Sequence, residues 1–348
     1  MINGIIRKFA EEMTPPAAAA SPVLPPAAQA GAAPATDEDA AISASVEALR
    51  AAADEMRRPV SPEAMSPIER GILPPLKADS AISGSPPPPL NPGHARLAAI
   101  TDSLATGSFD VYLEPVAGLS DRKVRHHEIT LRLKWESGGS LGAREYVPAT
   151  RGTGMLPMID ALRLTRASTM ARHMDERGIG GALFATVSAE ALISQGFIAE
   201  FGEVCRQSQR LSERLVLLFD HADVRSFTSA HWTTIRQLSE AGFRLGIDDA
   251  QSLDLDLPDM KNAGFAFIRI NARSLMDGVP SLEGPLTAAD VNERLTGTGL
   301  SLIVVGLEDN AHLASALDAG IPLGQGPLFG PRLPIKAQAL QPTRSVAA

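Results

Sequence analysis

The sequence predicts an α/β barrel of the eight-stranded TIM-like type, preceded by a Pro/Ala-rich arm. From residue 96 onward, apolar runs of roughly five residues alternate with amphipathic helical stretches over about 240 residues, a pattern typical of a barrel built from β/α repeats. No GxGxxG follows the first expected strand, which disfavours a dinucleotide-binding sheet. The sharp change of composition before residue 94 predicts a separate N-terminal segment.

Residues 1–93 are rich in Pro, Ala and Ser and contain runs such as four consecutive prolines at 86–89. Such a segment buries too little apolar surface to offset its ordering entropy, so we predict a disordered arm. Within it, 2–13 and 37–58 have apolar residues at helical spacing and predict short helices. The segment at 37–58 could be a partner-binding or dimerising helix, or a transient helix in a linker. The segment at 2–13 could be a docking peptide, a weak interfacial anchor, or a frayed start of the chain. We expect the folded domain at 94–336 and a flexible tail at 337–348.

Apolar periodicity and turn residues place the elements of the barrel. We expect strands at 109–116, 125–135, 182–187, 215–219, 243–247, 265–270, 301–305 and 324–329. We expect helices at 96–105, 158–177, 189–194, 197–208, 231–241, 288–295 and 310–319.

Acidic and basic side chains point to a site at one end of the barrel. The strand at 243–247 is followed directly by Asp248 and Asp249, and active sites of such barrels lie at the carboxyl ends of the strands. On the strand at 125–135, Glu128 and Arg132 share one face. His126 shares that face and His127 does not, so the two histidines cannot join Glu128 in one metal site.

Composition narrows the classes of partner and environment. The formal net charge is −8, so no basic field favours a nucleic-acid polymer. A single cysteine, Cys205, allows no intrachain disulfide. The chain contains no apolar run of the roughly 18–20 residues that span a bilayer and no secretory leader. We therefore expect a cytoplasmic protein.

Eight short segments, in order, resemble the EAL domain, the bacterial cyclic di-GMP phosphodiesterase fold. Glu128-Ile129-Thr130-Leu131-Arg132 is similar to the family's EALxR, and Gly246-Ile247-Asp248-Asp249 resembles its DDFGTG region. The remaining similar segments are 112–115, 146–148, 154–160, 268–271, 304–308 and 324–331. The resemblance implies a barrel in which carboxylates and an Asn hold Mg²⁺ or Mn²⁺, which activates a water that hydrolyses cyclic di-GMP.

Several positions depart from the pattern that this chemistry needs. The acids Glu128, Asp248 and Asp249 remain, as does Gln325. Positions where the family has an Asn, a Glu, a Lys, an Asp and a Glu here hold Thr186, Leu218, Arg269, Asn271 and Val305. Leucine and valine offer no oxygen ligand, and a fixed Arg cation cannot replace a Lys that orients a metal-bound water. The resemblance therefore implies a degenerate member with no catalytic residue, no metal site and no cofactor.

Nucleotide binding remains as a second expectation. The candidate ligand-binding residues are Arg132, Glu128, Asp248, Asp249, Arg269, Glu308 and Gln325. Alternatively, Arg132 forms an ion pair with Glu128 or Asp249, and the acid pair is a remnant neutralised by Arg269. Glu114, where the family has Gln, brings a negative charge towards the same place.

We therefore predict a catalytically inactive EAL-type signalling module that serves as a cyclic di-GMP receptor or as a protein-interaction scaffold. Its partners would be cyclic di-GMP, a protein bound through the arm or the barrel surface, or a second copy in a homodimer. The alternative is an active phosphodiesterase that depends on Mg²⁺ or Mn²⁺.

Overall fold

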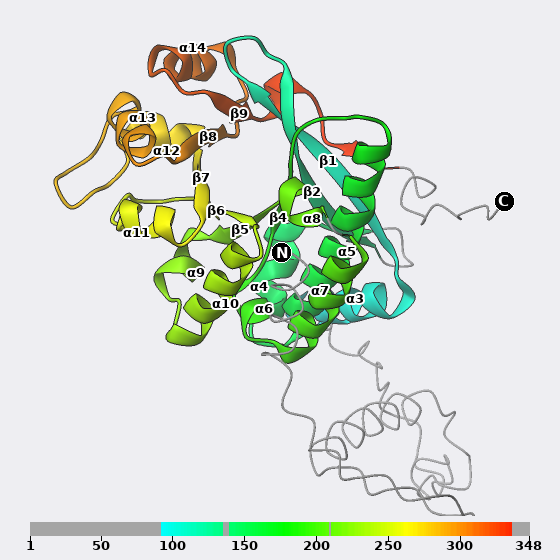
Figure 1. Cartoon of the computed structure of the whole chain (residues 1–348). Coiled ribbons are helices and arrows are strands. Elements are labelled where there is room, and N and C mark those ends of the chain that lie inside the picture. The colour runs from blue at the N-terminus through cyan, green and yellow to red at the C-terminus, as the bar shows by residue number, and fades with distance from the viewer. Residues whose placement is uncertain (1–91, 135–138, 209, 336–348) are drawn as a thin grey trace, which may run out of the picture. The chain divides into compact units, whose positions relative to one another are not determined.

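The computed structural model describes residues 92–134, 139–208 and 210–335 (Figure 1). The helices expected at 2–13 and 37–58, the tail at 337–348 and nearly all of the arm lie outside these residues. The expected strand at 125–135 reaches Lys134 here, because Trp135 also lies outside them.

Within the described residues, ten strands form one sheet. They are β1 (Phe109–Gly118), β2 (Val124–Lys134), β3 (Ser140–Leu141), β4 (Leu183–Thr186), β5 (Leu215–Asp220), β6 (Arg244–Asp248), β7 (Phe265–Asn271), β8 (Ser301–Val305), β9 (Leu323–Gln325) and β10 (Leu333–Pro334).

The helices lie mainly between successive strands. They are α3 (Pro92–Thr106), α4 (Ala143–Thr150), α5 (Met155–Glu176), α6 (Ala189–Leu192), α7 (Gln195–Gln207), α8 (Leu211–Arg214), α9 (His221–Arg225), α10 (Ser229–Glu240), α11 (Leu257–Asn262), α12 (Ala272–Asp277), α13 (Ala288–Gly297), α14 (Asn310–Asp318) and the 3₁₀ turn η2 (Pro327–Phe329).

Eight of the strands close into a barrel, which confirms the predicted fold class. The order around the ring is β1-β2-β4-β5-β6-β7-β8-β9, and β9 pairs back onto β1. Strands β2 and β4 to β9 run parallel to one another, whereas β1 runs antiparallel to both of its neighbours. The carboxyl ends of the seven parallel strands therefore meet at one end of the barrel, which we call the mouth.

The strand sequences explain why the barrel is buried on both faces. All five residues of β5 from Leu215 to Phe219 are buried, as a parallel strand between helices and lumen requires. Inside the barrel an apolar cluster, the lumen plug, fills the space beneath the mouth. It consists of Val116, Ala182, Phe184, Val216, Leu218, Phe267 and Ile303. Polar groups at the mouth therefore lie directly above the lumen plug.

The structure differs from the expected elements mainly in short segments. Helices α9, α11 and α12 contain only five or six residues, too few to show a helical period. Each is nonetheless capped by a side chain, from Asp220, Asp256 and Asn271 respectively. The strand expected at 324–329 is divided between β9 and η2. Among the described residues, no helix is long and apolar enough to cross a membrane.

Candidate functional site at the barrel mouth

Arg269 lies at the centre of the mouth. It extends from β7, and its Nη2 donates to Glu128 Oε2 on β2 at 2.9 Å and to Gln325 Oε1 on β9 at 3.0 Å. Gln325 Nε2 donates to the same Glu128 oxygen at 2.6 Å. All three side chains are buried. One guanidinium thus joins strands from opposite sides of the ring.

Asp248, at the end of β6, completes this group, which we call the mouth network. Its Oδ1 lies 3.3 Å from Arg269 Nε. The guanidinium therefore stands between two carboxylates. Its Nε and Nη1 are buried and make no hydrogen bond within the described residues. Of the two adjacent acids, Asp248 and not Asp249 pairs with Arg269.

The charges of the mouth network alter one another's titration. Burial favours the neutral form of Glu128, but the Arg269 guanidinium and the hydrogen bonds from Arg269 and Gln325 outweigh it, so the pKa of Glu128 is lowered. Burial raises the pKa of Asp248, and the nearby Glu128 charge adds to this although Arg269 opposes it. Burial disfavours the Arg269 cation, yet Asp248 and Glu128 together raise its pKa. Arg269 is a permanent cation at this position.

Asp249 lies apart from the mouth network. Its φ is +48°, in the left-handed region that few non-glycine residues adopt, and its side chain is exposed. Its backbone N–H donates to Asp248 Oδ1 at 3.0 Å. The next residue, Ala250, donates its N–H to the Arg269 carbonyl at 2.9 Å, which ties this loop to β7. The Asp249 side chain is thus exposed and makes no ion pair with Arg269.

A second ion pair lies on the neighbouring strand β1. Glu114 is opposite Glu128 in the β1–β2 register, and its Oε2 accepts from Arg332 Nε at 2.5 Å. The Glu114 side chain is 8% exposed and that of Arg332 is 62% exposed. The negative charge that the sequence places at 114 is therefore neutralised by a residue just before β10. Sequence reasoning missed Arg332, because nothing local links it to a partner 218 positions away.

The positions that depart from the family pattern have other structural roles. Leu218 belongs to the lumen plug and is fully buried. The Thr186 carbonyl accepts from Arg163. Asn271 Oδ1 caps α12 by accepting the Arg273 N–H at 2.9 Å. Val305 packs against the lumen plug. None of these four side chains brings a charge to the mouth.

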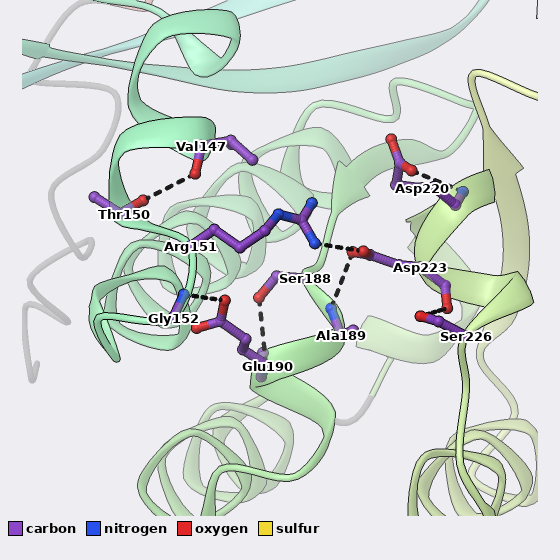
Figure 2. A network of polar contacts seen from close by, with 12 residues as sticks. Val147, Thr150, Arg151, Gly152, Ser188, Ala189, Glu190, Asp220, Asp223 and Ser226 are labelled. Atoms are coloured by element: carbon purple, nitrogen blue, oxygen red, sulfur yellow. Dashed lines mark hydrogen bonds and ion pairs between the residues drawn. The ribbon is translucent and has the colours of Figure 1, made fainter.

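Ion pairs and hydrogen bonds also fasten the rim of the mouth (Figure 2). Arg151, after α4, reaches across to Asp223 of α9 with Nη1 2.7 Å from Oδ1. The Gly152 N–H donates to Glu190 Oε1 at 2.8 Å. Asp223 Oδ2 also accepts from the Ala189 N–H at 3.4 Å. The loop after α4, helix α6 after β4 and helix α9 after β5 are therefore held together by charged side chains that sequence reasoning did not identify.

Two candidate residues remain open to solvent. Arg132 extends from the exposed part of β2 and Glu308 from the loop after β8. Within the described residues neither side chain forms a hydrogen bond or an ion pair, so Arg132 does not make the ion pair with Glu128 or Asp249 that was one expectation.

Comparisons with known proteins agree with this architecture. The EAL domain family model matches residues 97–332. The Xanthomonas citri FimX EAL domain, solved in complex with c-diGMP, is 16% identical with a TM-score of 0.59, and the match covers 70% of this chain and 95% of that one. The PaMucR phosphodiesterase in its c-di-GMP complex is 17% identical with a TM-score of 0.60, covering 71% and 100%.

The FimX EAL domain from Pseudomonas aeruginosa, bound to c-di-GMP, is 22% identical with a TM-score of 0.55, and the match covers 66% of this chain and 93% of that one. At these identities the structural matches establish a shared fold. A comparison with curated protein sequences finds no match. The family model spans more than half of the sequence and every strand of the closed barrel, so the chain belongs to the EAL domain family.

Proposed function

We propose that this EAL domain does not hydrolyse cyclic di-GMP and acts instead as a receptor for it at the barrel mouth. The observation that carries the proposal is the position of Arg269. Its guanidinium lies 2.9 Å from Glu128 Oε2 and 3.3 Å from Asp248 Oδ1, between the two acids that the family pattern assigns to a metal ion.

The residues at the mouth do not fit Mg²⁺ or Mn²⁺. Such ions need several oxygen ligands in near-octahedral geometry. Here Arg269 occupies the space between Glu128 and Asp248, Leu218 offers no oxygen, and the Asn271 oxygen caps a helix. Asp249 points to solvent. The side chains present therefore support a site in which the Arg269 cation takes the place of a metal ion.

Hydrolysis would require Arg269 to leave this position. Its departure would leave Glu128, which is 6% exposed, without its counter-charge. Leaving a buried carboxylate unpaired costs about 3–5 kcal/mol. The alternative of an active phosphodiesterase therefore needs a rearrangement that the contacts of the mouth network oppose.

Binding is supported by one cation that remains free. Arg132 is exposed and has no partner within the described residues, and arginine suits a ligand phosphate because its donors match phosphate oxygens in pairs. Glu114, which would repel a phosphate, is paired with Arg332. Solved EAL domains with c-di-GMP bound share this barrel. We therefore place the nucleotide over the mouth network, with one phosphate near Arg132.

We also propose a location and protein partners. We place the protein in the cytoplasm, and we assign contacts with a protein partner to the arm (1–93) or to the barrel surface, with a homodimer as one form. In that setting, bound cyclic di-GMP would act through the partner protein and would not be removed by hydrolysis.

One titration tests the proposal. Cyclic di-GMP is titrated calorimetrically into the full chain in EDTA, and again in Mg²⁺ or Mn²⁺, while chromatography follows the linear dinucleotide. We expect micromolar or tighter binding in EDTA, at least about tenfold weaker binding for Arg132→Ala, and no linear product. Arg144→Ala, which removes an exposed charge from α4, is the control.

Three results would count against this proposal in different ways. Metal-dependent linear product would establish the phosphodiesterase alternative. Absence of binding with and without metal would leave the scaffold role and remove the receptor role. Binding that Arg132→Ala leaves unchanged would remove Arg132 from the site.

A further inference from the structure

A cavity of about 410 Å³ opens at the end of the barrel opposite the mouth, where β2 and β4 begin. It is lined by Val124, Arg125, His127, Ile179, Gly180 and Gly181. The first three belong to β2, and the last three to the loop between α5 and β4. None of these residues takes part in the mouth network.

The loop on one side of this cavity is held in place from both ends. The Ile179 N–H donates to the Met174 carbonyl at 2.8 Å, and the Ala182 N–H donates to His126 Nδ1 at 3.1 Å. Between them, the Gly181 carbonyl accepts from Arg214 Nη1 at 2.9 Å. The backbone of residues 179–182 is thus fixed before any ligand arrives.

Two successive backbone donors in this loop remain unused. Within the described residues, the N–H groups of Gly180 and Gly181 donate to no protein acceptor. Gly181 has φ +95°, and a Cβ there would lie 2.1 Å from the Arg125 carbonyl oxygen, so only glycine fits. Successive free N–H groups in such a turn form a concave site for an anion.

The surrounding charge favours an anion as well. Arg125 is one of the lining residues; its Nη2 lies 2.6 Å from Asp121 Oδ2, and its side chain stays 50% exposed. His126, next along β2, has its pKa lowered to about 4, first by burial and then by the neighbouring basic residues Arg244, His127 and Arg125.

Two apolar side chains form the rest of the wall. Val124 is 49% exposed and Ile179 is 43% exposed, and both line the cavity. They offer a surface to an apolar group next to the anion-binding donors. Ligand sites of this kind combine apolar walls with a few fixed polar groups.

We propose that this cavity binds a small molecule with a phosphate or carboxylate group on an apolar body. The anionic oxygens accept from the Gly180 and Gly181 N–H groups and from Arg125, and the body contacts Val124 and Ile179. This site is separate from the mouth, so its existence does not depend on cyclic di-GMP binding.

Titration of the full chain, labelled with ¹⁵N-glycine, tests the site by nuclear magnetic resonance. The probes are phenyl phosphate and benzoate, with inorganic phosphate as the probe that lacks an apolar body. We expect the Gly180 and Gly181 amide signals to shift with phenyl phosphate or benzoate, and inorganic phosphate to bind at least about fivefold more weakly. The Gly180→Ala variant assigns one signal by its loss.

Three variants locate the probe. A Cβ at Gly180 meets no atom within 4 Å and its φ is not left-handed, so Gly180→Leu should fold and fill the cavity, abolishing binding. Gly297→Leu is the matched control, because a Cβ there also meets no atom within 4 Å. Arg125→Ala should weaken phenyl phosphate binding about tenfold.

Unshifted Gly180 and Gly181 signals with both aromatic probes would overturn the proposal, as would Gly180→Leu binding as tightly as the unaltered chain. Equal affinity for inorganic phosphate and phenyl phosphate would overturn the role of Val124 and Ile179. Preference for phenyl phosphate over benzoate, or the reverse, identifies the anionic group.

Discussion

Arg269 determines the charge balance of the mouth, because it is the cation that faces both Glu128 and Asp248. Removing one partner of a buried ion pair leaves the other charge unpaired. We expect Arg269→Ala to lower the free energy of unfolding by about 3–5 kcal/mol in urea denaturation, and Arg269→Lys to lower it much less. Arg144→Ala should leave it unchanged. Equal stability of Arg269→Ala and the unaltered chain would show that the mouth network contributes no stability.

The ion pair between Glu114 and Arg332 can be tested by mutating each partner. Arg332→Ala leaves the buried Glu114 carboxylate opposite Glu128 without a cation, so the free energy of unfolding should fall by about 1–3 kcal/mol. Adding Glu114→Gln should recover most of this loss, because the uncharged amide needs no counter-ion. A double-mutant cycle by urea denaturation measures the coupling, and additive effects of the two changes would argue against the pair.

The lowered pKa of His126 predicts that the stability of the fold depends on pH. Its Nδ1 accepts the Ala182 N–H, and its folded-state pKa is about 4 against an ordinary 6.5. As pH falls below 6.5, the unfolded chain binds a proton that the folded chain does not, so stability falls until about pH 4. Allowing for solvent screening of a partly exposed group, the loss is about 1–2 kcal/mol.

The test compares this slope with that of His126→Asn, which keeps an acceptor but does not titrate. Between pH 6.5 and 5, urea denaturation should show a flatter dependence for the variant, whatever its stability at pH 7. Parallel slopes for the two proteins would exclude His126 as the source.

At the scale of elements, β5 and β6 determine how tightly the lumen is filled. A Cβ at Gly246 would lie 2.7 Å from Leu218 Cδ2, deep in the lumen plug. We expect Gly246→Ala to lower the unfolding free energy by about 1–3 kcal/mol through overpacking. Because Leu218→Ala opens space at that point, the double variant should lose less than the sum of the single changes, as measured by thermal denaturation. If the two losses of stability simply add, the Gly246→Ala clash is not with Leu218.

At the scale of the molecule, the closed ring of strands lies within residues 109–325, and β10 and α3 pack against it. We expect a chain of residues 90–336 to fold without the arm, with the same far-ultraviolet circular dichroism per barrel residue and a melting temperature within a few degrees of the full chain. Aggregation or loss of a cooperative transition would show that the barrel depends on residues outside this range.

The amino-acid sequence determined the order and type of most elements. Apolar runs in β4 to β8 and the amphipathic periods of α5, α7, α10, α13 and α14 were predicted within a few residues, because local periodicity reflects which faces are buried. The acids at the end of β6 also identified the end of the barrel where the site lies. Helices α9, α11 and α12 escaped prediction, because five or six residues cannot show a period. The eight-residue α4 was also missed, whereas the four-residue α6 was predicted.

Only the tertiary structure decided how the charges are paired. Arg269 meets Glu128 across 141 positions of sequence and Arg332 meets Glu114 across 218, and such distances are set by barrel closure, not by local pattern. The antiparallel insertion of β1 between β2 and β9 makes this closure possible and brings those strands together. Asp248 and Asp249, adjacent in sequence, are separated by a left-handed backbone turn that places one beside Arg269 and the other in solvent.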